Sequence, residues 1–283
     1  MRVSALLLSC AVLAGAAVPE LDRARKLYNS TDFEQSLKVL QAAPQKDAEV
    51  WELIGRNYYM MGDYKRASES LEKAAAVDPG NSRIALWLGR SWGRRAETSS
   101  FVTAPGHASK ARQWFEKAVE LNPKNLEALS DLLEYYLEAP GFLGGGFDKA
   151  HAVANRMSAI DPAEGYWAKA KLAEKRKEFR SAEESLKRAI DVSPQAVGRF
   201  IDLAKFLAKH GRFQEANQNL AKAEKLGPND PKVIYTKADL LIQEKRDLQV
   251  AKDLLKRYMT LRLSPDDPSK ADAQKLLKQV EGS

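Results

Sequence analysis

The chain has 283 residues, of which 44% are hydrophobic and 29% charged, and its formal net charge is +7. This composition is typical of a soluble globular protein and excludes a disordered or fibrous one. The single cysteine, Cys10, excludes an intramolecular disulfide framework and a zinc site built from several cysteines. The basic excess permits acidic partners, but charges so evenly mixed do not indicate a nucleic-acid-binding protein.

Residues 1–18 have the features of a secretory signal peptide. Arg2 precedes an unbroken run of apolar and small residues, and the run contains Ala14-Gly15-Ala16, which suits signal peptidase. The run is shorter than the roughly 20 residues that a membrane-spanning helix needs, and no other stretch is apolar enough to span a bilayer. We therefore predict an exported protein, periplasmic or secreted, without a transmembrane segment in the mature chain.

A lipid anchor is the lesser alternative for this segment. Cys10 follows Leu7-Leu8-Ser9, a sequence similar to the lipobox of bacterial lipoproteins. The cysteine stands very early, however, and the apolar run continues beyond it to Val18. Cleavage near Ala16 would leave a mature chain without any cysteine, held together by packing alone.

An anchor triplet recurs five times along the rest of the chain. Each copy has a small residue, a second one seven positions later and a proline five positions after that, and Met157 alone departs from this pattern. The copies are Ala67-Ala74-Pro79, Ala111-Ala118-Pro123, Ala150-Met157-Pro162, Ala182-Ala189-Pro194 and Ala216-Ala223-Pro228.

Upstream of each triplet stands an apolar segment whose residues recur at intervals of three and four, as on one face of a helix. Each unit is therefore predicted to be a pair of antiparallel helices. Gly55 or Gly89 in the first helix, facing Ala67 or Ala111 in the second, would let the two backbones approach closely. The prolines end the second helices, and Asn or Asp residues after them can cap the next helix.

The copy that runs from Trp51 through Ile54-Gly55, Tyr58, Gly62, Tyr64, Ala67, Leu71 and Ala74 to Pro79 resembles the signature of the tetratricopeptide repeat family. The copy from Phe200 to Pro228 resembles it almost as well. The resemblance covers roughly Glu20 to the C-terminus. The short signal segment and the lack of disulfides additionally indicate an exported bacterial member of this family. The resemblance implies an all-α, right-handed superhelical solenoid of antiparallel helix pairs.

The expected units follow from the repeat boundaries. The second and third units each carry an insertion, and a capping helix is expected to begin at Asp267-Pro268 and to cover the last exposed core. The units are 20–47, 48–81, 82–125, 126–164, 165–196, 197–230 and 231–264, and the capping helix spans 267–281.

The resemblance also implies a concave binding groove lined by the first helices, with groove-facing residues three before, one after and four after the small residue. The predicted groove residues are Arg56, Tyr59, Leu86, Arg90, Trp167, Lys171, Ile201, Lys205 and Tyr235. The asparagine of the family's carboxylate clamp is absent from every copy. The basic groups interleaved with aromatic ones would suit an extended peptide that carries acidic residues. The alternative is an ordinary solvated helix face.

Both insertions, within 94–107 and 138–147, fall at the same point of consecutive units, so they should emerge side by side on one edge of the stack. Apolar residues in loops favour a partner-binding ridge there. The alternative is that these loops merely cover exposed core. The predicted ridge residues are Phe101, Pro105, Phe142, Leu143, Gly144, Gly145, Gly146 and Phe147.

The sequence contains no Ser-His-Asp order, no His-Glu-x-x-His and no Gly-x-Ser-x-Gly. The carboxylates of Glu183-Glu184 are expected to be solvated on a helix surface. We therefore predict no catalytic residue, no metal and no cofactor, and a non-catalytic scaffold that binds a partner protein or peptide in the cell envelope.

Two alternatives remain open. The first is an enzyme or metal-dependent accessory with a site formed by loops 94–110 and 138–148, where His107 and His151 could approach each other. Two histidines without an assured third ligand make a poor zinc site. The second alternative is a structural spacer in an envelope complex.

Overall fold

The computed structural model describes residues 18–264, 267–268 and 270–281. All regular structure within these residues is helical, namely fifteen α-helices and one short 3-10 helix, η1. The predicted signal segment falls outside the described residues except for Val18, which begins α1. In the part of the chain that the structure covers, no helix combines the length and the apolar character needed to cross a bilayer.

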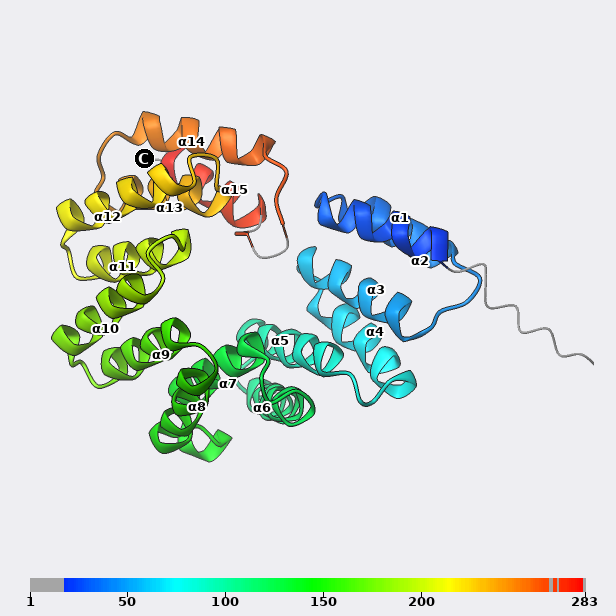
Figure 1. Ribbon diagram of the computed structural model, residues 1–283. Coiled ribbons are helices and arrows are strands. Elements are labelled where there is room, and N and C mark those ends of the chain that lie inside the picture. Colours follow the sequence, from blue (N-terminus) through cyan, green and yellow to red (C-terminus); the bar gives the residue numbers. More distant parts are fainter. Residues whose placement is uncertain (1–17, 265–266, 269, 282–283) are drawn as a thin grey trace, which may run out of the picture.

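Consecutive helices pack as pairs, and the pairs stack in serial order along a curved path, with α1–α2 and α14–α15 at its two ends (Figure 1). The predicted all-α solenoid of stacked helix pairs is confirmed. The helices are α1 (Val18–Asn29), α2 (Phe33–Ala42), α3 (Ala48–Met60), α4 (Tyr64–Val77), α5 (Ser82–Thr98), α6 (Ala104–Leu121), α7 (Leu126–Glu138), η1 (Gly141–Leu143), α8 (Phe147–Ile160), α9 (Pro162–Lys175), α10 (Phe179–Val192), α11 (Val197–Lys209), α12 (Phe213–Leu226), α13 (Pro231–Gln243), α14 (Leu248–Thr260) and α15 (Lys270–Glu281).

Polar caps and prolines set the helix boundaries. The side chains of Asn81, Asn125 and Asp230 accept hydrogen bonds from the first free backbone N–H groups of α5, α7 and α13. The second helix of each unit with an anchor proline ends two residues before that proline. At Pro162 no loop follows, because Asp161 caps both the end of α8 and the start of α9.

The small residues of the repeat lie where the two helices of a pair cross. Ala67, Ala111 and Ala216 are fully buried. A Cβ atom placed on Gly55 would lie 2.5 Å from Cγ of Leu71 and 3.0 Å from the carbonyl oxygen of Ala67. The crossing therefore has no room for even one extra methyl group.

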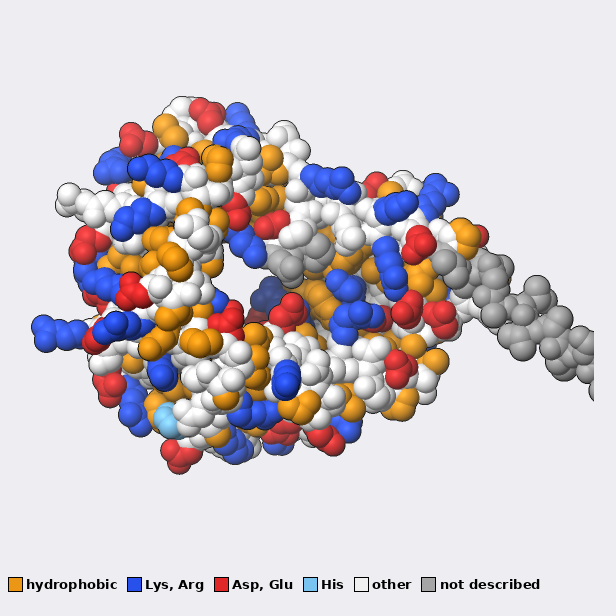
Figure 2. Space-filling model, in the orientation of Figure 1, with side chains coloured by type: hydrophobic (Ala, Val, Ile, Leu, Met, Phe, Trp, Pro, Cys, Tyr) orange, Lys and Arg blue, Asp and Glu red, His pale blue; other side chains and the backbone are white. Residues whose placement is uncertain are grey.

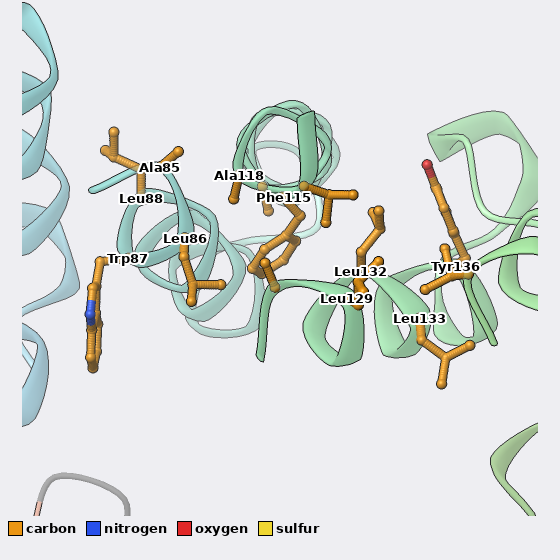
Figure 3. Packing of buried hydrophobic residues seen from close by; sticks show 14 of the residues in the cluster. Ala85, Leu86, Trp87, Leu88, Phe115, Ala118, Leu129, Leu132, Leu133 and Tyr136 are labelled. Carbon is orange, nitrogen blue, oxygen red and sulfur yellow. The ribbon is translucent and has the colours of Figure 1, made fainter. Parts of the chain in front are cut away.

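Gly89 faces a different neighbour from the one predicted. A Cβ atom on Gly89 would lie 2.4 Å from Cδ1 of Phe115, so the phenyl ring, and not Ala111, is its first contact. Phe115 extends from α6 toward α5 and α7, above the apolar residues of α7 (Figure 3). The larger ring fills the space that a small residue leaves open in the first helix.

The buried apolar residues form four clusters in succession along the stack. The largest cluster spans Leu71–Leu172, and the next spans Ala170–Leu240. Trp167 is partly buried and packs against both of them. Each helix pair thus buries its apolar residues against those of its neighbours, as expected for a linear repeat protein.

The insertion of the second unit is mostly helical rather than a loop. Helix α5 continues to Thr98 and α6 begins at Ala104, so only residues 99–103 connect them. Helix α5 has 17 residues and α6 has 18, whereas the corresponding helices of the neighbouring units have 13 and 14, so this hairpin is the longer one. Helix-compatible residues such as Arg94, Arg95 and Ala96 propagate the helix because each adds one more backbone hydrogen bond.

The capping helix begins later than predicted. Helix α15 starts at Lys270, whereas Asp267 and Pro268 belong to the turn after α14. The carboxylate of Asp267 accepts hydrogen bonds from the backbone N–H and hydroxyl of Ser264, and the hydroxyl of Tyr258 donates to the carbonyl oxygen of Pro268. These bonds hold Asp267 and Pro268 in the turn that precedes α15.

Glu183 is not a freely solvated carboxylate, contrary to our expectation. Its side chain is only 16% exposed and pairs with Arg212, at the start of α12, and with Lys187 on its own helix. Hydrogen bonding from Arg212, with a smaller contribution from Lys187, lowers the pKa of Glu183 to about 2. The contact links the outer helices α10 and α12 of neighbouring units.

We predict opposite effects for two glycine-to-alanine substitutions on first helices. Gly55→Ala should lower the free energy of unfolding by about 1–2 kcal/mol because the added methyl overpacks the crossing. Gly93→Ala should raise it by about 0.5–1 kcal/mol, because a Cβ atom there meets open space and alanine favours the helix. Urea unfolding followed by circular dichroism measures both. Equal effects of the two substitutions would contradict the proposed crossing.

The pair formed by Glu183 and Arg212 predicts an acid-dependent loss of stability. Because the pKa of Glu183 is lower in the folded than in the unfolded chain, its contribution is complete above pH about 4.5 and disappears as the pH falls toward about 2. Glu183→Gln should therefore lower stability at neutral pH and flatten its dependence on pH in that window. The matched control is Glu184→Gln, on the same helix. Thermal melts at several pH values provide the measurement.

Candidate partner-binding site

The first helices of successive units are joined by ion pairs. Helices α5, α7 and α9 lie on the inner side of the curve and α6, α8 and α10 on its outer side (Figure 1). Arg90 of α5 pairs with Asp131 of α7 at 2.5 Å and with Glu127 at 3.3 Å. Glu134 of α7 then pairs with Lys171 of α9 at 3.4 Å. The opening at the centre of the molecule consequently shows both acidic and basic side chains at its edge (Figure 2).

This pairing changes the electrostatic prediction for the groove. The sequence suggested a surplus of basic groups free to meet an acidic peptide. In the structure Arg56 lies 3.5 Å from the carboxylate of Glu52, and Arg90 and Lys171 are paired as described. Burial raises the pKa of Asp202 and that of Asp239. The positive charge of Lys205, which lies near both carboxyls, opposes this rise. Each predicted basic groove residue therefore has a carboxylate of this chain nearby.

Three of the predicted groove residues, Arg56, Tyr59 and Arg90, belong to a column of stacked cations and rings at the N-terminal end. The guanidinium of Arg56 lies 4.7 Å from the ring centroid of Tyr28 and 4.9 Å from that of Trp87. The rings of Tyr59 and Trp87 meet edge to face, with their centroids 5.2 Å apart. The guanidinium of Arg90 also lies over Trp87, 5.1 Å from its ring centroid. Such contacts hold the first helices in register.

Trp167, Lys171 and Lys205 come together in one small cleft of about 170 Å³ between α9 and α11. The ammonium group of Lys171 lies 5.1 Å from the Trp167 ring. The carboxylates of Glu174 and Asp202 line the same cleft. These three predicted residues are thus near neighbours, in mixed electrostatic surroundings.

Three other predicted groove residues have mainly packing roles. Leu86 and Ile201 are buried in the two central clusters, so neither is accessible to a partner, and this part of the groove prediction is corrected. Trp167 and Tyr235, at the same repeat position, are only partly buried, so the position three before the small residue is not covered equally in every unit. Tyr235 packs edge to face on Tyr258 at 5.4 Å, and burial raises its pKa to about 12.

A larger cleft of about 500 Å³ opens between α5, α6, α7 and η1. We call it the hairpin cleft, because the extended α5–α6 hairpin forms one wall. The opposite wall consists of the last turns of α7 and the segment from Ala139 to Leu143. Its floor includes Ala111 and Phe115 of α6. Volumes of this order are typical of binding sites.

The hairpin cleft unites residues from the two predicted sets. Tyr59 and Arg90 come from the groove set, and Leu143 comes from the ridge set. Burial raises the pKa of Tyr59 to about 12, so its hydroxyl stays protonated and able to donate. Burial also raises the pKa of Asp131 above its usual value, although Arg90 acts in the opposite direction.

The predicted ridge residues have different environments. Phe101, in the hairpin turn, is 89% exposed, and Phe142, in η1, is 82% exposed, so both are accessible to a partner. Leu143 lines the cleft, and its carbonyl oxygen accepts a hydrogen bond from Tyr135 at 2.9 Å. Pro105 belongs to the first turn of α6 and not to a loop, because proline fits that turn without losing a hydrogen bond.

Phe147 is likewise not a loop residue. It is the first residue of α8, packs partly buried against the central core and lies 3.8 Å from the guanidinium of Arg176. Phe147 therefore packs against the core and is not part of an exposed ridge.

The three glycines before α8 serve the backbone. Gly144 has a φ of +87° and ends η1 in the left-handed conformation. A Cβ atom on Gly145 would lie 1.8 Å from the carbonyl oxygen of Ala139. Gly146 donates its N–H to the carbonyl oxygen of Tyr136 at 2.9 Å. The glycines thus fold the segment back onto α7 and shape the wall of the hairpin cleft.

The structure does not bring the two histidines of the insertions into contact. The Nδ1 atom of His107 lies 2.9 Å from the hydroxyl of Ser99, whereas His151 contacts Asn155 on its own helix. Over the described ranges, no three His, Cys, Asp or Glu side chains are grouped as metal ligands.

Several residues of the hairpin cleft escaped the sequence analysis. Gly93 occupies the position four after Gly89, which the repeat geometry already marks as groove-facing. Ala108 and Tyr135 line the cleft from α6 and α7. Neither carried a signal, because the cleft depends on the helical extension of the hairpin, and the insertion was interpreted as a loop.

Comparisons with known proteins agree with this architecture. Models of the tetratricopeptide repeat match residues 48–81, 106–125 and 168–231. The chain is a tetratricopeptide-repeat protein. Proteins of this family are in general non-catalytic scaffolds for protein–protein interaction.

Solved structures of tetratricopeptide-repeat proteins share the fold. One from Parabacteroides merdae has a TM-score of 0.58 at 16% identity, covering 94% of this chain and all of its own. A thermophilic repeat protein from Thermus thermophilus has a TM-score of 0.52 at 19% identity, covering 80% of this chain and all of its own. The Cut9–Hcn1 hetero-tetramer of the APC/C matches at a TM-score of 0.51 and 15% identity, over 92% of this tetratricopeptide-repeat chain and 48% of the other. The comparison with curated proteins gives no match.

The glycine segment offers a test of how the cleft wall is built. Gly145→Ala should lower the free energy of unfolding by about 2–3 kcal/mol, because its methyl group would meet a backbone carbonyl that cannot move without disturbing α7. Gly141→Ala, where a Cβ atom meets open space, should leave stability nearly unchanged. Differential scanning calorimetry compares the two variants. Identical melting temperatures would show that the wall does not depend on this close approach.

Proposed function

We propose that the protein is an exported, non-catalytic scaffold of the cell envelope that binds a segment of a partner protein. The hairpin cleft is the observation on which this proposal rests most. It is lined by α5, α6, α7 and η1, and two exposed aromatic residues lie in segments next to its lining residues, Phe101 in the turn between α5 and α6 and Phe142 beside Leu143. Exposed apolar side chains beside a formed cleft are typical of protein interaction sites.

Membership of the tetratricopeptide-repeat family supports the binding part of the proposal. Stacked helix pairs create long curved surfaces on which an extended segment can contact several units at once. The export part rests on the sequence of residues 1–18, whose charge, length and small residues fit a signal peptide. Periplasmic location is favoured over lipid anchoring for the reasons given for Cys10.

Site-specific crosslinking tests the binding surface. A photoreactive phenylalanine analogue at Phe142 should form an adduct with a partner protein in the native cell, because this exposed position is next to Leu143, which lines the hairpin cleft. The same analogue at Val77, which is 59% exposed at the end of outer helix α4, should not. Adducts are detected by gel shift and mass spectrometry. Equal crosslinking from both positions, or none from Phe142, would argue against a partner site at the cleft.

Export has its own test. Fusion of alkaline phosphatase to the C-terminus of the full chain should give an active enzyme, since this reporter matures only outside the bacterial cytoplasm. A fusion to the chain beginning at Val18 should be inactive in the same cells. Activity of both fusions, or of neither, would contradict the signal-peptide assignment. Mass measurement of the exported protein would locate the cleavage site relative to Cys10.

A further inference from the structure

The hairpin cleft is open because small residues form its walls. Gly93 and Ala96 lie on α5, and Ala108 faces them from α6. A Cβ atom on Gly93 would meet no other atom within 4 Å. Phe115 and Leu143 supply apolar surface on the remaining sides. The cleft therefore has the size and lining to accept an apolar side chain.

The charged residues of the cleft are mostly acidic. Four carboxylates line it, and the side chains of Glu97, Glu134 and Glu138 are more than half exposed at its mouth. Two guanidinium groups oppose them. Glu134 pairs with Lys171 at 3.4 Å and Glu138 with Lys175 at 3.2 Å, and neither lysine lines the cleft. Ion pairs this exposed are weak, so the two carboxylates remain available to a partner.

The two guanidinium groups are already engaged. Arg90 is only 21% exposed and contacts both Asp131 and Glu127, while Arg94 contacts Glu97 and the hydroxyl of Tyr64. A carboxylate brought into the cleft by a partner would thus meet two cations, of which Arg90 is largely buried, and four carboxylates that repel it. Burial raises the pKa of Asp131, because the charged carboxylate is destabilised there. A further cation in the cleft would stabilise that charge.

From this charge complementarity we infer that the hairpin cleft binds an apolar side chain of an extended partner segment in which a lysine or arginine stands beside the apolar residue. The inference rests on the proposed scaffold function and adds the chemistry of its ligand. The apolar side chain fills the space above Gly93 and Ala108. The neighbouring cation reaches the carboxylates of Glu134 and Glu138 at the mouth.

Gly93→Leu blocks the cleft without loosening the fold. The new side chain extends into open space, and leucine is a better helix former than glycine, so the variant should melt at or above the temperature of the wild type. Gly198→Leu is the matched control, because Gly198 lies on a different first helix, α11, and a Cβ atom there also meets open space. Ala108→Met serves as a second blocking variant from the opposite wall.

The charge requirement has its own pair of variants. Glu134→Gln with Glu138→Gln removes two carboxylates from the mouth of the cleft. Glu69→Gln with Glu72→Gln removes two exposed carboxylates from outer helix α4 and controls for net charge.

The experiment selects random linear peptides displayed on phage against the purified wild-type protein and measures the affinity of the enriched peptides by fluorescence polarisation. We expect the enriched peptides to share an apolar residue next to lysine or arginine. Their binding should weaken by about tenfold or more in Gly93→Leu, because the blocked cleft excludes the anchoring side chain, and should be unchanged in Gly198→Leu. The Glu134/Glu138 variant should weaken binding by about fivefold, whereas the Glu69/Glu72 variant should not.

Two results would overturn the inference. Enriched peptides that are acidic, or that bind Gly93→Leu and Ala108→Met as tightly as the wild type, would reject this ligand chemistry while leaving the scaffold function in place. Failure of the wild type to enrich any peptide would also reject it, and crosslinking from Phe142 in the native cell would then decide separately whether the scaffold function survives.

Discussion

Close approach of two backbones at small residues is the constraint on which the rest of this protein depends. Where Gly55 crosses the helix that carries Ala67 and Leu71, a single added methyl group has no place to go. The tight crossing fixes the angle within a pair, and that angle, repeated along the chain, bends the stack into a curve. A looser crossing would give each pair freedom to rotate, and no continuous inner surface would form.

The curve brings charged residues of neighbouring first helices together, and their pairing determines what the inner surface offers to a partner. Basic side chains that look available in the sequence are held by carboxylates one unit away, as Arg90 is held by Asp131 and Lys171 by Glu134. These contacts support the stacking of units more than they attract ligands. Selectivity for a charged partner then depends on places where acidic and basic side chains are not equal in number. The hairpin cleft, with its acidic mouth, is such a place.

Periodicity predicted the fold well because it reports on packing that every unit shares. The burial of Ala67, Ala111 and Ala216 and the caps at Asn81 and Asn125 follow directly from spacing and residue type. The site was less predictable, since it depends on features found in only one unit. Residues 94–98 continue α5 because they contain no proline or glycine that would end a helix. From the shorter neighbouring units we had interpreted the added length as a loop. Leu86 and Ile201 were expected at the surface. A repeat position indicates which way a side chain points, but it does not indicate how far the next unit covers that side chain.

The succession of separate cores has a consequence for how this molecule melts. Helix α9 contributes buried residues to both of the two central clusters, Ala168 and Leu172 to the first and Ala170 and Ala173 to the second, and its Trp167 packs against both. Thermal cooperativity between the halves of the stack therefore passes through this helix. In a linear array, a change that loosens such a shared helix separates the transitions of the units on its two sides.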